Sequence, residues 1–244
     1  MGTIVAVGGG DIKKFETLKI DKEIIRLTGK ISPKVLFIPT ASGDSEDYIT
    51  NFKALYEKKL KCNISVLTLL RNRPTHNEIK EVILSTDVIY VGGGNTLRMM
   101  KLWRKLGLDN LLKKAYDKGI ILAGVSAGAI CWFTYGHSDS RKYSSGKGAD
   151  FIKVRGLGLY GYIFCPHYHK EKREKSFAEM MKKNKDFIGL AADNNAALKI
   201  VDGKISLLKS ERSGKAYEVV VTGRNVTLEP IQQTQLHKSF SPLF

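Results

Sequence analysis

The chain has 244 residues, of which 43% are hydrophobic and 26% charged, and this balance excludes a disordered chain and a fibrous repeat. Lysine and arginine number 40 and aspartate and glutamate 24, so the formal net charge is +16. The basic residues are interleaved with acidic ones in amphipathic segments such as 172–175, which favours solvated helix faces. A field that attracts acidic substrates and a nucleic-acid surface are the weaker interpretations.

The cysteines and the N-terminus indicate a reducing compartment. Cys62, Cys131 and Cys165 have no CxxC spacing, so neither a disulfide framework nor a metal site is expected. The N-terminus lacks a basic region and reaches Asp11 too early for a signal peptide. We therefore expect a cytoplasmic protein.

Apolar runs alternate with helical segments along the first half of the chain. In chain order we expect a strand at 3–7, a helix at 19–28, a strand at 35–38, a helix at 46–59, a strand at 64–67, a helix at 77–85, a strand at 88–91, helices at 95–106 and 108–118, and a strand at 120–123. Each strand is almost continuously apolar, which is typical of a parallel sheet covered by helices on both faces.

The rhythm changes after residue 138. We expect a polar loop at 139–150, a strand at 160–164 and a helix at 172–183. Asp202 and Gly203 lie between two short expected strands at 198–200 and 205–207, which predicts a β-hairpin within a short antiparallel C-terminal annex. The tail after Gln232 is expected to fray. Because no linker interrupts the sequence, a single domain over 1–244 is expected.

The uncharged run 119–138 meets the length rule for a membrane span. Four glycines interrupt it, and its two halves differ: 120–123 suits a buried strand and 127–132 a buried helix start. We expect this run to be core and not membrane.

The sequence Gly-Val-Ser-Ala-Gly at 124–128 has the pattern of a nucleophile elbow. The small residues permit the sharp strand-to-helix turn that exposes Ser126, and the helix N-terminus favours developing negative charge. A purely structural strand–turn–helix would use the same residues.

A glycine run at 92–94 follows the strand at 88–91 and precedes another helix. Its amides suit an anion. A nucleotide site is the rival, but the run does not continue as GxGxxG and no Walker lysine-serine pair follows. One of these amides together with that of Ala127 would form the two donors of an oxyanion hole.

A serine nucleophile needs a base, and the chain has five histidines. His76 lies in a polar turn and His237 in the tail, so His137, His167 and His169 remain. His167 lies at a strand end, where sheet enzymes gather their sites, but position alone does not separate it from His169. The candidates for the orienting carboxylate lie at expected loop starts or strand ends: Asp139, Asp150 and Asp193.

The order of these motifs resembles the aspartyl dipeptidase (peptidase E) and cyanophycinase family of serine peptidases. The resemblance is carried by Gly92 to Thr96, Ser126 within Gly-Val-Ser-Ala-Gly-Ala, Pro166-His167 and the segment 188–193, and it runs from 39 to about 198. It implies a fold similar to class I glutamine amidotransferases: an α/β, doubly wound, mainly parallel sheet flanked by helices.

The resemblance also implies the site. It assigns the nucleophile to Ser126, the base to His167, the acid to Asp193 and the oxyanion donors to the amides of Gly94 and Ala127. The family's acid is often glutamate, so the shorter aspartate must lie closer to the base.

Two further residues qualify the assignment. Asp139 resembles an extra acidic residue of the aspartyl dipeptidases and is the alternative acid. The amidotransferases carry cysteine at the elbow, whereas Cys131 is expected in the core, so glutamine hydrolysis by a thiolate is not expected.

The sequence thus predicts a serine peptidase acting on short peptides, with an N-terminal acidic residue preferred. It needs no metal or organic cofactor, and neither a nucleic-acid nor a membrane partner is expected. Arg173 is the expected cation for the acidic residue, weighed evenly against a solvated arginine, with Asn95 and Asp139 as weaker pocket candidates. The alternatives are a cyanophycinase-like β-aspartyl peptidase and an idle binding protein on the same fold.

Overall fold

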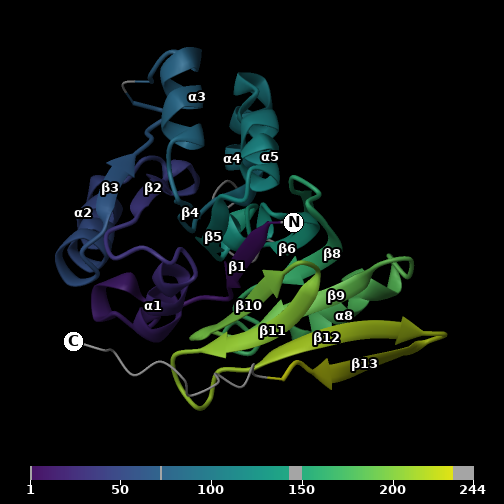
Figure 1. The fold of residues 1–244 in the computed structure, drawn as a ribbon. Coiled ribbons are helices and arrows are strands. Elements are labelled where there is room, and N and C mark those ends of the chain that lie inside the picture. Colours follow the sequence, from purple (N-terminus) through teal and green to yellow (C-terminus); the bar gives the residue numbers. More distant parts are fainter. Residues whose placement is uncertain (1, 72, 143–149, 233–244) are drawn as a thin grey trace.

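The computed structural model describes residues 2–71, 73–142 and 150–232, and these residues form two β-sheets with flanking helices (Figure 1). The first sheet has seven strands in the order β11-β10-β1-β5-β4-β2-β3, and the second has six in the order β13-β12-β9-β8-β6-β7. The expectation of a single domain over 1–244 stays a prediction.

The first sheet has a parallel centre. Its strands are β1 (Thr3–Val7), β2 (Lys34–Ile38), β3 (Asn63–Val66), β4 (Val88–Val91), β5 (Ile121–Val125), β10 (Ala196–Val201) and β11 (Lys204–Lys209). Strands β1 to β5 pair in parallel, and the β10–β11 hairpin extends the β1 edge antiparallel. The expected hairpin turn is confirmed, because Asp202 and Gly203 both have positive φ, of 48° and 82°.

Helices cover both faces of this sheet. They are α1 (Leu18–Arg26), α2 (Glu46–Lys53), α3 (His76–Leu84), α4 (Thr96–Leu106) and α5 (Leu108–Asp117), with the 3-10 turns η1 (Ile12–Lys14) and η2 (Thr40–Ser42) and the π-helical turn η3 (Ala54–Lys59) after α2. Successive β1 residues enter opposite cores: Ile4 and Ala6 pack in one cluster, and Val5 and Val7 in the other. This two-sided burial explains the continuous apolar runs and confirms the doubly wound parallel sheet.

The second sheet is larger than the annex expected from the sequence. Its strands are β6 (Phe133–Ser138), β7 (Ile152–Arg155), β8 (Tyr160–Cys165), β9 (Ile188–Ala192), β12 (Ala216–Thr222) and β13 (Asn225–Pro230). Strands β6, β8 and β9 pair in parallel, and the others join antiparallel. Helix α8 (Glu174–Lys182) packs on it through Phe177 and Met181.

The sequence pattern missed β6 because the preceding helix is unusually short. Helix α6 spans only Ala127–Ile130, and the chain turns back as a strand. A Cβ added to Gly136 would lie 2.3 Å from a side-chain carbon of Ile130, so this glycine lets β6 pack directly against the helix. The expected loop at 139–150 lies partly outside the described residues, as does the tail after Gln232.

The uncharged run 119–138 contains β5, α6 and β6, and most of its residues are buried. Within the described ranges, every helix is too short or too polar to cross a membrane. The expectation that 120–123 begins a core strand is confirmed by β5, whose strand pairing starts one residue later.

Candidate active site

Ser126 lies at a sharp turn between β5 and α6. Its backbone has φ 54° and ψ −111°, outside the regions that L-residues ordinarily adopt, a strain of about 1–3 kcal/mol. A Cβ added to Gly124 would lie 2.3 Å from the carbonyl oxygen of Gly128, and one added to Gly128 would lie 2.0 Å from that of Val91. The glycines of the motif are therefore required by close backbone packing, which keeps the serine in its strained conformation.

The end of β1 holds together three segments of the site. Three consecutive carbonyls accept backbone hydrogen bonds: that of Val7 from Ser126 at 3.0 Å, that of Gly8 from His167 at 3.0 Å, and that of Gly9 from Asn195 at 2.9 Å. Because these segments follow β5, β8 and β9, the carboxyl ends of strands from both sheets meet at one place, where α/β enzymes build their sites.

The glycine run after β4 lies beside the elbow. A Cβ added to Gly93 would lie 3.6 Å from the Cβ of Ser126. Gly94 has φ 137°, and a Cβ there would lie 2.2 Å from the carbonyl oxygen of Ala41, so glycine is required on both counts. The amide of Ala127 is the first of α6 and has no partner within that helix. The two amides expected to bind an oxyanion thus lie in the loop after β4 and at the first residue of α6, directly after Ser126.

His167 is a half-buried imidazole beside this turn. Its Nδ1 lies 2.7 Å from the Oδ1 of Asn194. Burial lowers the pKa of His167, while the hydrogen bond with Asn194 and the charge of Glu171 act in the opposite direction. The imidazole is consequently neutral at physiological pH, the state that a general base requires. Among the described residues, no hydrogen bond joins the Ser126 hydroxyl to this ring, a contact that often tightens only with substrate bound.

The contact expected between Asp193 and His167 is not the one observed. Asp193 accepts hydrogen bonds from the backbone amide of His169 at 3.1 Å and from its ring Nδ1 at 2.8 Å. Asn194, one residue further after β9, occupies the position against His167. Asp193 directly follows β9 and Asn194 begins the turn before β10, so the two neighbouring side chains contact different histidines.

The other two candidate acids, Asp139 and Asp150, do not take the role of orienting His167 either. Asp139 is partly buried at the end of β6 and raises the pKa of His167 only as the weakest of several influences. Asp150 is exposed. Neither makes a hydrogen bond with an imidazole among the described residues.

Two proposed substrate contacts have structural partners instead. Asn95 is the N-cap of α4, accepting from the amide of Arg98 at 3.0 Å, and its own amide group donates to the carbonyl of Ser140 at 3.2 Å. Arg173 is 1% exposed, so it is not solvated. Its guanidinium donates to the carboxylate of Glu171 and the carbonyl of His137, which leaves it poorly placed to hold a substrate carboxylate.

Cys131 is fully buried, as expected, and donates to the carbonyl of Gly128. Burial raises the pKa of its thiol, which disfavours the reactive thiolate. It therefore does not compete with Ser126 as a nucleophile.

A cavity of about 690 Å³ opens beside the two histidines. Its lining includes His167, His169, Lys170, Asp193 and Asn194. The cavity thus brings a cation and polar groups next to the imidazole, whereas Ser126 is not among its lining residues.

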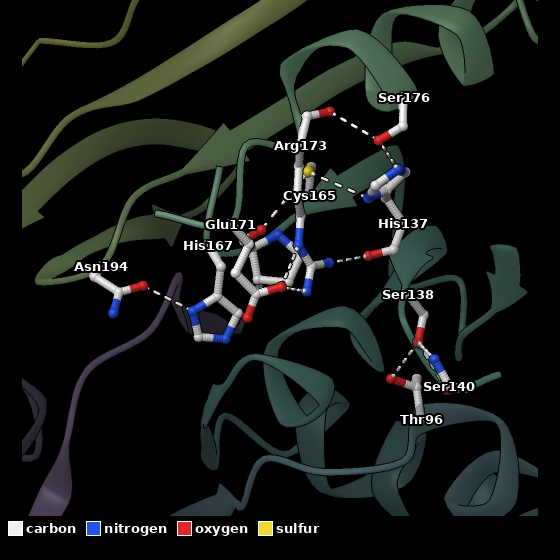
Figure 2. A network of polar contacts seen from close by, with 11 residues as sticks. Thr96, His137, Ser138, Ser140, Cys165, His167, Glu171, Arg173, Ser176 and Asn194 are labelled. Carbon is white, nitrogen blue, oxygen red and sulfur yellow. Dashed lines mark hydrogen bonds and ion pairs between the residues drawn. The ribbon is translucent and has the colours of Figure 1, made fainter. Parts of the chain in front are cut away.

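Sequence reasoning missed Asn194 and Glu171. The search for an orienting group considered only carboxylates, although an amide oxygen also accepts from a ring N–H. Glu171 follows His167 by one turn of chain, and its amide donates to the His167 carbonyl at 3.0 Å. Figure 2 shows both residues next to His167.

A strained serine at a strand–helix turn, near a half-buried neutral imidazole and the first amide of α6, defines a hydrolase of the serine type. The sequence profile of peptidase family S51 matches residues 4–208. The chain therefore belongs to peptidase family S51, the peptidase E family, and is a serine-type peptidase.

Two relatives that are named as peptidases are similar to this chain over most of its length. The uncharacterised peptidase YgaJ of Bacillus subtilis is 36% identical over 234 residues, covering 95% of this chain and 97% of the relative. An uncharacterised peptidase of Listeria innocua is 28% identical over 185 residues, covering 70% and 86%.

Two solved structures share the fold. The crystal structure of a peptidase from an acI-B1 actinobacterium aligns with a TM-score of 0.67 at 21% identity, covering 96% of each chain. That of a putative peptidase E protein from Listeria monocytogenes aligns with a TM-score of 0.63 at 20% identity, covering 86% of this chain and 98% of the other. These likenesses confirm the fold class expected from the sequence.

Proposed function

We propose that this peptidase hydrolyses short peptides through an acyl-enzyme on Ser126, with His167 as the general base. The observation that carries the proposal is the strained backbone of Ser126, with φ 54°. Strain of this kind persists at functional sites because the surrounding packing enforces it. The amides of Gly94 and Ala127 are the proposed oxyanion donors.

The residues divide the chemistry as follows. The Oγ of Ser126 attacks the peptide carbonyl as its proton passes to His167, and the carbonyl oxygen becomes an oxyanion held by the two amides. The tetrahedral intermediate collapses, and His167 gives the proton to the departing amine. Water then attacks the ester, losing its proton to the same imidazole, and the acid product leaves with Ser126 restored.

We further propose dipeptides with an N-terminal acidic residue as the preferred substrates. The support comes from Lys170, an exposed cation on the cavity beside His167, and from the strongly basic chain. This lysine takes the place of Arg173, whose donors are engaged by Glu171 and a backbone carbonyl. The proposed partner is thus a short peptide, with neither nucleic acid nor membrane required, and the proposed location is the cytoplasm, where the buried free cysteines stay reduced.

A dipeptide panel tests the specificity. We expect kcat/KM for Asp-Xaa to exceed that for Asn-Xaa by about tenfold, the effect of one good charged contact. Lys170→Met should remove most of that preference, and Lys175→Met, on exposed α8 surface, should leave it unchanged. Equal turnover of Asp-Xaa and Leu-Xaa by the native enzyme would remove the acidic preference and leave the peptidase.

Asp11 and Glu16 line the same cavity and favour a second candidate substrate. Carboxylates there suit a basic group, as in the β-aspartyl-arginine units that a cyanophycinase-like enzyme cleaves. Release of β-aspartyl-arginine products, with no cleavage of Asp-Xaa, would select this alternative. A protein that reacts with no covalent serine probe would instead be the idle binding protein on the same fold.

A further inference from the structure

The side chain that contacts the proposed base, His167, is that of Asn194, which is uncharged. In a Ser-His-Asp triad, the carboxylate both fixes the ring tautomer and stabilises the imidazolium that forms when the serine proton is taken. The amide Oδ1 of Asn194 accepts the Nδ1–H of His167 and so fixes the tautomer with Nε2 free. A neutral amide does not supply the negative charge.

A carboxylate is held close to the same ring by another route. The backbone amide of Glu171 donates to the carbonyl of His167 at 3.0 Å. Its Oε2 accepts from Nη2 of Arg173 at 2.7 Å and from Nε at 3.1 Å. Figure 2 shows the carboxylate between the guanidinium and the imidazole.

The arginine fixes this carboxylate because the guanidinium is itself immobile. Arg173 is 1% exposed, donates from Nη1 to the carbonyl of His137 at 2.8 Å, and stacks 4.6 Å from the centre of the Phe151 ring. Burial alone would raise the pKa of Glu171, but Arg173 reverses this and lowers it. Glu171 is therefore ionised beside the base.

We propose that Asn194 and Glu171 divide the two tasks of the usual triad carboxylate, Asn194 orienting the His167 imidazole and Glu171 supplying the charge that stabilises its protonated form. The inference rests on the proposed function. Both are positioning residues, because each acts through His167. The charged groups that act on this ring are Glu171 and Arg173 on the turn before α8 and Asp139 at the end of β6, with Lys170 and Asp193 on the cavity wall.

The test measures the protonation of the ring as well as turnover. Histidine ring resonances of the full chain are titrated by NMR, with His167 assigned through His167→Gln. Glu171→Gln should lower the pKa of His167, move the acidic limb of the kcat/KM profile to lower pH and reduce kcat/KM about tenfold. The matched control, Glu179→Gln on exposed α8 surface, should leave all three unchanged.

Asn194→Asp provides an independent arm. A carboxylate on Nδ1 should raise the pKa of His167 and move the acidic limb upward. In this background, Glu171→Gln should cost less than it does alone, because the charge is then supplied at Nδ1. If Glu171→Gln fails to fold with the guanidinium unpaired, Glu171→Asp replaces it: the shorter side chain keeps a charge for Arg173 but withdraws it from the ring, so the pKa of His167 should still fall, by a smaller amount.

An unchanged His167 titration in a folded Glu171→Gln or Asn194→Asp variant would overturn the inference. The titration needs no turnover, so this failure is distinct from failure of the proposed function. The latter is recognised by a native enzyme whose Ser126 does not react with a fluorophosphonate.

Discussion

The Nδ1 atom of His167 lies 2.7 Å from the amide oxygen of Asn194. The preceding Asp193 lies on the other histidine of the cavity, with its carboxylate 2.8 Å from the Nδ1 of His169. The two histidines thus have different partners, one neutral and one charged. This pairing changes what substitution of the aspartate should do.

The first prediction concerns Asp193. A triad aspartate replaced by asparagine costs about 10⁴-fold in kcat. Because Asp193 contacts His169 and not His167, we expect Asp193→Asn to reduce kcat less than about tenfold in steady-state assays of a short peptide. A loss of three orders of magnitude in a folded variant would return the triad role to Asp193.

The second prediction concerns the glycine behind the imidazole. A Cβ added to Gly9 would lie 2.3 Å from Nδ1 of His167 and 2.5 Å from Oδ1 of Asn194. Gly9→Ala should therefore displace the ring, lowering kcat/KM at least about tenfold and the free energy of unfolding by about 1–3 kcal/mol. Gly161→Ala, where an added Cβ meets no atom within 4 Å, is the control and should change neither quantity. Native activity in Gly9→Ala would contradict the geometry of the base.

The third prediction is a pH dependence of stability. Burial, partly offset by hydrogen bonds from Tyr56 and Thr17, raises the pKa of Asp21 from 3.8 to about 6. The folded chain then keeps a proton that the unfolded chain has lost, so this contribution to stability is complete below the unfolded pKa and disappears as the pH rises through about 6. We expect the free energy of unfolding to fall by up to about 3 kcal/mol from this group.

Urea unfolding of the native chain and of Asp21→Asn, measured from about pH 4 to about pH 7, checks this expectation. The stability difference between the two should shift in favour of the variant as the pH rises. The exposed Asp117→Asn serves as control. A difference that stays constant across this range would show that Asp21 does not titrate there.

Much of the first sheet was predictable because the burial of each strand and helix is visible in its own stretch of sequence. Strands such as β4 are buried on both faces, so every residue from Val88 to Val91 is apolar, and the helices between them carry one apolar stripe each. The second sheet was harder to predict. Its strand β6 contains Thr134, Gly136 and His137, and its place depends on tertiary contact of Gly136 with α6.

The candidate site, too, was predictable only in part. Ser126 could be predicted because a sharp strand-to-helix turn demands small residues around it, whereas the choice of Gly94 within the glycine run came from the family resemblance. The partner of His167 could not be predicted, since Asp193 and Asn194 are adjacent and only the direction of the chain after β9 decides which one faces the ring. The burial of Arg173 was likewise invisible in a segment rich in lysine.

The central claim, that Ser126 is the nucleophile, is tested most directly by peptide mass spectrometry after treatment with a fluorophosphonate. We predict a single phosphonylated residue, Ser126, with labelling abolished in Ser126→Ala and at least about a hundredfold slower in His167→Gln, since the hydroxyl then lacks its base. Ser126→Ala should also lower kcat for a short peptide by about three orders of magnitude or more. An unlabelled Ser126 in active native enzyme, or native turnover by the alanine variant, would contradict the account.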